Sequence, residues 1–513
     1  MTPDIGLANW FLQRSLRAPE RLALHFEGES WTYGRMQQRI EQCAAKLRAL
    51  GVGKGDRVAF LGLNQPMFLF SMFATLRLGA IFAPLNFRLT GPELAFMIND
   101  CAARALIVDA QLRGVIAPVQ AQLPTVNALL AAEDEATWLN GEAEPADHAP
   151  ASEDDVAMIM YTSGTTGRPK GAMLTHGNFW WNGANGMHTI DFLQNDVTLT
   201  AAPLFHIGGL NVTTLVTLQK GGLVVLHRAF DPGKALADIA AQRVTTMFGV
   251  PAMFQFMCQH PAFPRTDLSS VRVLVVGGAP CPVPVLNAYQ ARGVPMQQGY
   301  GLTETAPMVS FLAPEFALDK VGSSGKTPIF VDLKLVDAGG RRVTAPGAKG
   351  EVLVRGPNVS PGYWNLPEAS RGAFDANGWF RTGDAAYLDE EGFLFICDRV
   401  KDMIISGGEN VYPAEVESGL MRHPAIADVA VIGEPDEKWG EAIVAIVVLK
   451  AGQTLTIEEL RGFAGEFLAR YKLPSRLETI AALPRNATGK ILKFQLRKMF
   501  ARADGAPAGA NRP

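Results

Sequence analysis

The chain has 513 residues, of which 48% are hydrophobic and 19% charged, and its formal net charge is −3 at pH 7. A chain of this length buries several cores, so we expect two or three domains, and its apolar fraction excludes a largely disordered protein. The small net charge gives no sign of a nucleic-acid partner or an anionic membrane surface.

The 5 cysteines stand apart, with no Cys-x-x-Cys pair and no Cys/His spacing typical of a metal site. Such isolated cysteines are typical of reduced thiols, so we expect a cytoplasmic protein. The first residues lack the charged-then-apolar pattern of a signal peptide, and no apolar run reaches membrane length. We therefore expect a soluble chain without a transmembrane segment.

The amino-terminal half alternates predicted strands and helices. Strands are predicted at residues 57–63, 80–84 and 105–109, and helices at 66–78 and 91–98. The alternation returns over residues 234–276, with a helix predicted at 251–259, and ends at Gly277-Gly278-Ala279-Pro280. This order predicts an α/β fold of parallel, doubly wound sheets, in which ligands bind at the carboxyl ends of the strands. We therefore assign Gly278, Ala279 and Pro280 to a ligand site.

Between these blocks, a predicted buried strand runs into a loop rich in glycine and hydroxyl side chains. Its candidate anion-binding residues are Thr162, Ser163, Gly164, Thr165, Thr166, Gly167 and Lys170. Converging backbone N–H groups, hydroxyl donors and a lysine charge together suit a polyphosphate better than a plain solvated turn. The loop is not a Walker A motif, because Arg168 and Pro169 separate Gly167 from Lys170. We expect it to share one crevice with Gly277-Gly278-Ala279.

The segment Tyr161-Thr-Ser-Gly-Thr-Thr-Gly-Arg-Pro-Lys-Gly171 resembles the phosphate loop of the adenylate-forming superfamily, which includes acyl-CoA synthetases and aryl-CoA ligases. The resemblance extends over about residues 10–500, with further motifs in the same order. It implies an adenylation domain over residues 1–400, with a β-barrel-like region at about 320–400, and a small mobile α+β lid domain over 401–503. Residues 504–513 are expected to be disordered.

The second motif is Gln297-Gln-Gly-Tyr-Gly-Leu-Thr-Glu-Thr305. Tyr300 offers a flat face for a purine, Thr303 a donor for a phosphate and Glu304 an oxygen ligand for Mg²⁺. The motif is similar to the nucleotide motif of the superfamily, so the resemblance gives these residues the same roles, together with Gln298, Gly299 and Gly301. Core packing is the alternative for Tyr300 alone.

The remaining site residues are assigned by resemblance. Asp384 would hold the ribose and Arg399 would contact the nucleotide, while Lys490 would be the catalytic lysine of adenylation. Lys401 would be the hinge between two orientations of the lid domain, and Gly407, Gly408 and Trp439 would line the CoA site. An aromatic residue that packs on its own domain is the alternative for Trp439.

These assignments predict an ATP-dependent CoA ligase that uses ATP, Mg²⁺ and coenzyme A, with a small carboxylic acid as partner. His206 and Gly277 would line the acyl site, although His206 is equally compatible with a structural histidine. A medium- or long-chain fatty acid is the first expectation, and a cinnamate- or benzoate-type acid the second. An enzyme that loads a carrier protein and a non-catalytic binding relative are alternatives, and a homodimer is left open.

Overall fold

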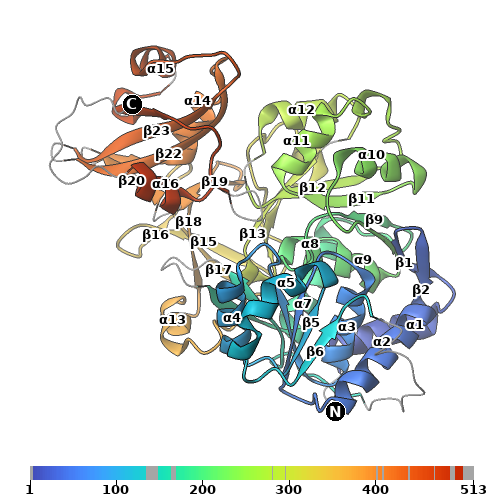
Figure 1. Ribbon diagram of the computed structural model, residues 1–513. Coiled ribbons are helices and arrows are strands. Elements are labelled where there is room, and N and C mark those ends of the chain that lie inside the picture. Colours follow the sequence, from blue (N-terminus) through green and yellow to red (C-terminus); the bar gives the residue numbers. More distant parts are fainter. Residues whose placement is uncertain are drawn as a thin grey trace. The chain divides into compact units, whose positions relative to one another are not determined.

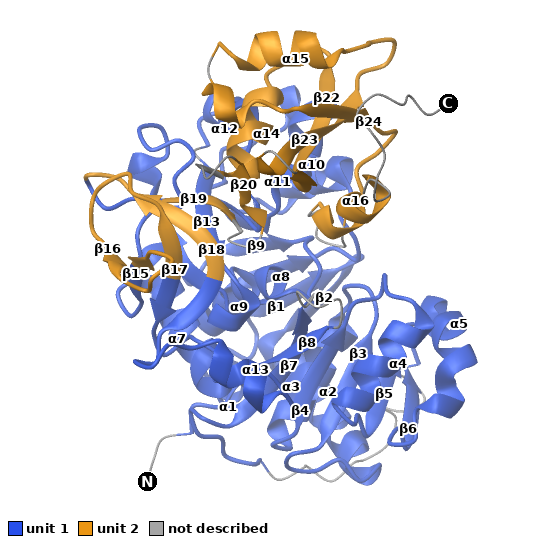
Figure 2. Ribbon diagram, turned by 90° about the vertical axis from the view of Figure 1, so that its left-hand side faces the viewer, with its two compact units in different colours: residues 1–334, 353–382, 391–394 blue, residues 335–352, 383–390, 395–513 orange. Residues whose placement is uncertain are grey.

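The computed structural model describes residues 4–134, 148–162, 169–279, 281–294, 296–399, 402–406, 409–436, 439–466, 468–485 and 491–500, with the side chains of Arg399, Glu409 and Asn410 left out. The chain divides into two compact units (Figure 2). Unit 1 contains residues 1–334, 353–382 and 391–394, and unit 2 contains residues 335–352, 383–390 and 395–513. The predicted change of domain at Lys401 stays a prediction.

The first sheet of unit 1 has six strands in the order β6-β5-β3-β4-β7-β8. They are β3 (Arg57–Leu61), β4 (Ile81–Leu85), β5 (Ala105–Val108), β6 (Ala128–Ala131), β7 (Val156–Thr162) and β8 (Lys170–Thr175). All neighbours run parallel except β7 and β8, which form an antiparallel hairpin.

The second sheet of unit 1 has eight strands in the order β14-β13-β12-β11-β9-β10-β1-β2. They are β1 (Leu22–Phe26), β2 (Glu29–Thr32), β9 (Val197–Thr200), β10 (Leu223–Leu226), β11 (Thr246–Gly249), β12 (Val273–Gly277), β13 (Met296–Gly301) and β14 (Met308–Phe311). The interior strands are parallel, and β2 and β14 pair antiparallel at the edges. The phosphate-loop strand β7 and the strand β12 therefore belong to different sheets, and the shared crevice of their loops stays a prediction.

Helices cover these sheets. They are α1 (Leu7–Arg17), α2 (Tyr33–Ala49), α3 (Pro66–Arg77), α4 (Gly91–Asp100), α5 (Arg113–Ile116), α7 (His176–Thr189), α8 (Ile207–Asn211), α9 (Thr214–Lys220), α10 (Pro232–Ala241), α11 (Pro251–Gln259), α12 (Val283–Gln290) and α13 (Pro367–Gly372), with short 3₁₀ turns that include η4 (Thr303–Thr305). Figure 1 shows α10, α11 and α12 beside β11 and β12, with which they share a core.

Helix α3 explains how the two sheets form one unit. All of its residues are buried, as expected of a helix that is apolar on every side. Its side chains share one core with Phe60 and Phe82 of the first sheet and with Leu24 and Val224 of the second. A separate core on the other face of the first sheet packs against α4. The helix therefore joins the two sheets through a common interior.

A third sheet has the order β16-β15-β17-β18-β19, and it is the predicted β-rich region. Its strands are β15 (Asp332–Val336), β16 (Arg342–Val343), β17 (Gly350–Arg355), β18 (Phe380–Leu388) and β19 (Leu394–Arg399). The elements that follow this sheet along the chain are β20 (Ile404–Ser406), β21 (Glu409–Val411), α14 (Pro413–Leu420), β22 (Ile426–Asp436), β23 (Gly440–Leu449), α15 (Ile457–Ala464), β24 (Arg476–Thr479) and α16 (Lys493–Phe500).

The predicted fold class is confirmed, since parallel sheets with covering helices dominate unit 1 and an α+β arrangement forms the small carboxyl-terminal part. Helix α15 begins with a capping box, in which Thr456 and Glu459 exchange hydrogen bonds at 2.8 and 3.2 Å. In the part of the chain that the structure describes, no helix is both long and apolar enough to cross a membrane.

Candidate functional site

The predicted phosphate loop closes the β7/β8 hairpin. Thr162 ends β7 and Lys170 begins β8, and the two residues pair across the hairpin. The Thr162 hydroxyl lies 3.4 Å from the carbonyl oxygen of Lys170. The candidate residues Ser163, Gly164, Thr165, Thr166 and Gly167 lie outside the described residues. The sequence predicted the strand that leads into the loop, but it did not predict β8, the antiparallel strand that leaves it.

The base of this hairpin is fixed by the end of helix α4. The Tyr161 hydroxyl donates a hydrogen bond to Asp100 Oδ2 at 2.7 Å. The carbonyl oxygen of Asp100 accepts from Trp364 Nε1 at 3.2 Å and from Asn365 Nδ2 at 2.9 Å. One residue at the end of α4 therefore holds both the strand before the phosphate loop and the segment around Trp364.

The second motif ends in a tight turn that carries Glu304. Gly301 must be glycine here, because a Cβ atom at this position would lie 1.6 Å from the carbonyl oxygen of Pro307. Thr305 closes the turn, since its hydroxyl lies 2.6 Å from that same oxygen and accepts the Leu302 N–H at 3.0 Å. Thr303 and Glu304 remain partly exposed within η4. The backbone contacts therefore set the turn, and the Glu304 side chain is free to serve another role.

Tyr363 brings the two motifs together. Its hydroxyl donates to Glu304 Oε1 at 2.9 Å, and its ring centroid lies 5.1 Å from Lys170 Nζ. Its backbone forms a bridge with Ala172 of β8. No sequence motif gave Tyr363 a role, and the available signal was the segment Gly362-Tyr363-Trp364, in which two aromatic residues follow a glycine.

The other residues of the second motif belong to β13. The Gln298 side chain is buried, accepts the Cys281 N–H at 3.2 Å and donates to the Ser323 carbonyl oxygen at 3.3 Å. Its amide group therefore fixes two neighbouring loops. Gly299 pairs with Gly277 of β12, and Tyr300 is half-buried opposite Ser310 of β14. Whether Tyr300 stacks on a purine stays a prediction.

The carboxyl end of β12 has little side-chain volume. A Cβ atom on Gly277 would lie 3.2 Å from the Gly299 carbonyl oxygen and 3.4 Å from the Phe248 ring. Gly278 has a φ of +84°, which favours glycine, and Gly278 and Ala279 are exposed. Pro280 lies outside the described residues.

His206 lies after the carboxyl end of β9 and directly before α8, with its ring centroid 4.2 Å from that of Phe205. Its Nε2 atom is enclosed and has no hydrogen-bond partner among the described residues. Burial, with a smaller contribution from the charge of Arg88, lowers the pKa of His206 to about 4. The imidazole is therefore neutral near pH 7, and within the described part of the chain its enclosed Nε2 atom has no hydrogen-bond partner.

Unit 2 carries the remaining candidates. Asp384 is buried in β18, and Arg399 ends β19 with its side chain outside the described set. Trp439 is half exposed between β22 and β23, and its backbone N–H donates to Asp436 Oδ1 at 2.9 Å. Lys401, Gly407, Gly408 and Lys490 lie outside the described residues.

The residues that flank the Lys490 segment are anchored on both sides. Before it, Arg485 bridges to Ile491, and the Pro484 carbonyl oxygen accepts the Leu492 N–H at 2.8 Å. After it, Lys493 begins α16 and lies 2.9 Å from Glu417 Oε1. The described residues on either side of this segment therefore contact each other, and Lys493 forms an ion pair with Glu417.

Glu304 is the residue predicted to bind Mg²⁺, and its surroundings show which kind of metal site it fits. Among the residues that the structure describes, no group of three or more His, Cys, Asp or Glu side chains could hold a metal ion. Mg²⁺, however, is commonly held by one or two carboxylates together with substrate phosphates and water. A single partly exposed carboxylate close to Lys170 of the phosphate-loop hairpin fits that kind of site and does not fit an all-protein metal site.

Comparison with known proteins identifies relatives over nearly the whole chain. A family model described as AMP-binding enzyme matches residues 11–364, and one described as AMP-binding enzyme C-terminal domain matches residues 415–490. The chain is 45% identical over 498 residues to a feruloyl-CoA synthase of Amycolatopsis sp, which covers 96% of this chain and 99% of that protein.

Two further relatives differ from the first in their named substrates. A long-chain-fatty-acid–CoA ligase of Mycobacterium tuberculosis is 39% identical, with 96% of this chain and 98% of that protein covered. A solved structure of o-succinylbenzoate coenzyme A synthetase from Bacillus subtilis, in complex with ATP and a magnesium ion, matches with a TM-score of 0.87 at 35% identity. That match covers 95% of this chain and 99% of the other.

Proposed function

Since the chain belongs to the AMP-binding enzyme family and is an ATP-dependent CoA ligase of acyl or aryl acids, we propose that its acid is aromatic and carries a polar substituent. The observation that carries this proposal is the enclosed Nε2 atom of His206, which has no partner among the described residues. A purely aliphatic tail beside it would leave a buried polar atom unpaired, which costs about 1–3 kcal/mol. A ring hydroxyl could pair with it.

Aromatic side chains around His206 support the same choice. Phe205 lies against the His206 ring, and Phe87 contacts Phe205 edge-on at 5.3 Å between centroids. Aromatic rings favour edge-to-face or offset contacts with one another, so these side chains suit a planar acid. The relative named feruloyl-CoA synthase is consistent with a hydroxylated aromatic acid. A fatty acid, the first expectation from the sequence, is retained as the second candidate because of the long-chain relative.

The proposed reaction has two steps. The acid carboxylate attacks the α-phosphorus of ATP, which forms an acyl-adenylate and releases pyrophosphate. The CoA thiol then attacks the acyl carbonyl carbon, loses its proton and expels AMP. The first step brings an anion against a polyanion, so positive charge and oriented donors must stabilise it.

Several segments of this chain are proposed to supply those groups. Thr162, Lys170 and the residues between them would bind the phosphates, and Lys490 would neutralise charge on the reacting phosphate. Glu304 would hold Mg²⁺, which when bound neutralises phosphate charge. Tyr300, Asp384 and Arg399 would bind the nucleoside, with Asp384 on the ribose.

The test of the proposed function is AMP release across a panel of acids, with and without CoA. We expect hydroxycinnamates and hydroxybenzoates to give the highest kcat/KM, and AMP formation to require CoA for turnover. A preference for long saturated acids would overturn the aromatic assignment. Turnover with an acyl carrier protein but little with free CoA would instead identify a carrier-loading enzyme.

A second experiment separates the two steps. We propose that the lid domain turns about Lys401 between an orientation for adenylation and one for thioester formation. Lys490→Ala should abolish adenylate formation and still convert a supplied acyl-adenylate to thioester, whereas Gly408→Leu should do the reverse. Lys401→Pro should impair thioester formation most. Equal loss of both steps in Lys490→Ala and Gly408→Leu, with the fold intact, would contradict this account.

Trp439 provides a test of the CoA site. The half-exposed indole is proposed as a platform for the adenine of CoA, together with Gly407 and Gly408 along the pantetheine arm. Trp439→Ala should raise the KM for CoA and leave the KM for ATP unchanged. If the KM for CoA does not change, Trp439 only packs on its own domain.

A further inference from the structure

Two of the groups proposed to act on ATP contact one residue that no sequence motif assigned. The Tyr363 hydroxyl donates to Glu304 Oε1 at 2.9 Å, and the face of the same ring lies 5.1 Å from Lys170 Nζ. All three residues belong to unit 1 and are described by the structure. Tyr363 is therefore the common neighbour of the carboxylate proposed for the metal and of the lysine proposed for the phosphates.

Tyr363 is itself firmly placed. Its N–H donates to Ser370 Oγ at 2.8 Å, and its backbone bridges to Ala172 of β8. The residues on either side are also bound to β8, since the Met173 N–H donates to the Gly362 carbonyl oxygen at 2.9 Å and the Trp364 N–H donates to that of Gly171 at 2.7 Å. The backbone of Tyr363 is thus fixed to strand β8 of the phosphate-loop hairpin.

Glu304, by contrast, depends on contacts outside its own turn. Its carbonyl oxygen accepts the Ser360 N–H at 2.7 Å, and its carboxylate receives the Tyr363 hydroxyl through Oε1. A flexible, partly exposed glutamate loses side-chain freedom when it is fixed for ligand binding, and a hydrogen bond already present in the protein lowers that cost. The hydrogen bond engages Oε1 and leaves Oε2 for another ligand.

We propose that Tyr363 is a positioning residue that orients the Glu304 carboxylate so that Oε2 receives the Mg²⁺ ion of ATP, while its ring face holds Lys170 toward the phosphates. This inference rests on the proposed use of ATP and Mg²⁺, and it does not depend on which acid is activated. The cation–π contact adds to it, because the face of an aromatic ring attracts an ammonium group. The two contacts hold the Glu304 carboxylate of η4 and the Lys170 side chain of β8 beside the same tyrosine.

The direct test is Tyr363→Phe, which keeps the ring and its contact with Lys170 and removes only the hydroxyl. We expect the Mg²⁺ concentration for half-maximal pyrophosphate release to rise about tenfold, as for the loss of a hydrogen bond to a charged group. The KM for the acid should stay unchanged. Unaltered Mg²⁺ dependence would overturn the proposal.

A binding measurement provides a readout other than turnover. Calorimetric titration with ATP should show weaker binding by Tyr363→Phe than by the natural protein when Mg²⁺ is present, and equal binding when Mg²⁺ is removed by a chelator. An equal loss under both conditions would contradict a role through the metal. Because no acid is added, a wrong assignment of the acid cannot produce this result.

Tyr161→Phe is the matched control. It removes a hydroxyl from the same hairpin, but that hydroxyl is bonded to Asp100 and not to Glu304. We expect it to leave the Mg²⁺ dependence unchanged even if the affinity for ATP falls. A shift like that of Tyr363→Phe would show that loosening the hairpin, and not the bond to Glu304, causes the effect.

A double-mutant cycle covers the case in which single variants change the fold. If Tyr363 acts through Glu304, then Tyr363→Phe should have almost no further effect on Mg²⁺ dependence in the Glu304→Gln background. Additive effects of the two substitutions would overturn the proposal. Thermal unfolding of the same four proteins separates a loss of stability from a loss of positioning.

Discussion

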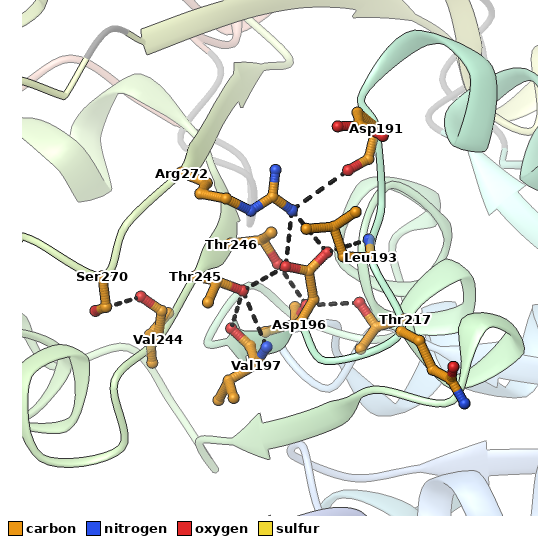
Figure 3. A network of polar contacts seen from close by, with 12 residues as sticks. Asp191, Leu193, Asp196, Val197, Thr217, Val244, Thr245, Thr246, Ser270 and Arg272 are labelled. Carbon is orange, nitrogen blue, oxygen red and sulfur yellow. Dashed lines mark hydrogen bonds and ion pairs between the residues drawn. The ribbon is translucent and has the colours of Figure 1, made fainter.

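The polar groups at the amino ends of strands β9 and β12 differ in their hydrogen bonding from those at the carboxyl ends. At the amino end, Asp196 precedes β9 and is 1% exposed. Its carboxylate accepts Arg272 Nη2 at 2.8 and 2.9 Å, the Thr245 hydroxyl at 2.8 Å and the Leu193 N–H at 2.7 Å (Figure 3). Both carboxylate oxygens therefore have partners within the protein.

Threonine residues extend this network into the sheet. The Thr198 hydroxyl of β9 bonds to Thr217 of α9 and to Thr246 of β11. The hydroxyl of Thr245, directly before β11, also accepts the Val197 N–H at 2.9 Å. The network joins the amino ends of β9, β11 and β12 and has the saturated hydrogen bonding typical of a structural core.

At the carboxyl ends of the same strands, the polar groups are incomplete. His206 follows β9 with an enclosed nitrogen that has no partner among the described residues, and β12 ends at Gly277 with Gly278 exposed behind it. Ligands of parallel sheets bind at these ends. A closed set of hydrogen bonds therefore stabilises the protein at one end, while the other end, with its unpaired polar atom among the described residues, is where the acid is proposed to bind.

The largest expected effect is on rate and comes from the ligand-binding side of unit 1. Glu304→Gln keeps the side-chain shape and removes its charge, so adenylation should fall by at least ~10²-fold. Stability should change by no more than about 0.5 kcal/mol, because Glu304 is partly exposed. Pyrophosphate release at saturating Mg²⁺ measures the rate, and a rate equal to that of the natural protein would refute the assignment.

At the closed end, the expected effect is on stability. Asp196→Asn leaves Arg272 and Thr245 without their charged partner, so the free energy of unfolding should fall by about 2–3 kcal/mol. Urea denaturation measures this loss, and Thr245→Val, which removes one donor, should cost about 1 kcal/mol. The kcat of both variants should be unchanged at temperatures where they remain folded. A specific loss of kcat would break the distinction between the two ends.

The pH dependence of stability tests the open end. Burial lowers the pKa of His206 to about 4, from about 6.5 in the unfolded chain, so the folded state binds fewer protons between these values. The free energy of unfolding is therefore highest above pH 6.5. It falls with the pH below that value, by about 1–2 kcal/mol between pH 6.5 and pH 5, because the unfolded chain binds the additional proton.

The His206→Phe variant should lack this part of the decline in the free energy of unfolding, because phenylalanine binds no proton. Burial also lowers the pKa of His176 to about 4, and this second histidine remains in the variant as an internal reference. Denaturation at several pH values should therefore show a shallower, not a flat, dependence for His206→Phe. An unchanged pH dependence would mean that His206 is not buried in its neutral form.

The smallest expected effect concerns the glycines after β12. Gly278→Ala places a side chain at a φ of +84°, which should cost about 1 kcal/mol of stability. Gly293→Ala is the matched control, because Gly293 has a φ of +75° and open space around it. Both variants should lose similar stability, but only Gly278→Ala should raise the KM for the acid. Equal acid KM values would remove Gly278 from the ligand site.

The sequence by itself determined the elements whose causes are local. Helix α11 begins and ends where predicted, over Pro251–Gln259, because proline is favoured in the first turn and the pattern of buried residues is helical. The strand before the phosphate loop was predicted for a similar reason. The motif residues also carried enough local information to indicate the family, since their spacing lies within single loops.

Only the tertiary structure decided which distant groups meet. It joined Lys170 and Glu304 through Tyr363, closed the Asp196 network with Arg272 and placed β7 and β12 in different sheets. It also left the Nε2 atom of His206 without a hydrogen-bond partner among the residues that the structure describes. Each of these outcomes depends on contacts between segments far apart in the chain. Periodicity and turn chemistry report the preferences of neighbouring residues, and they carry no information about the partner that a buried polar group finds across the fold.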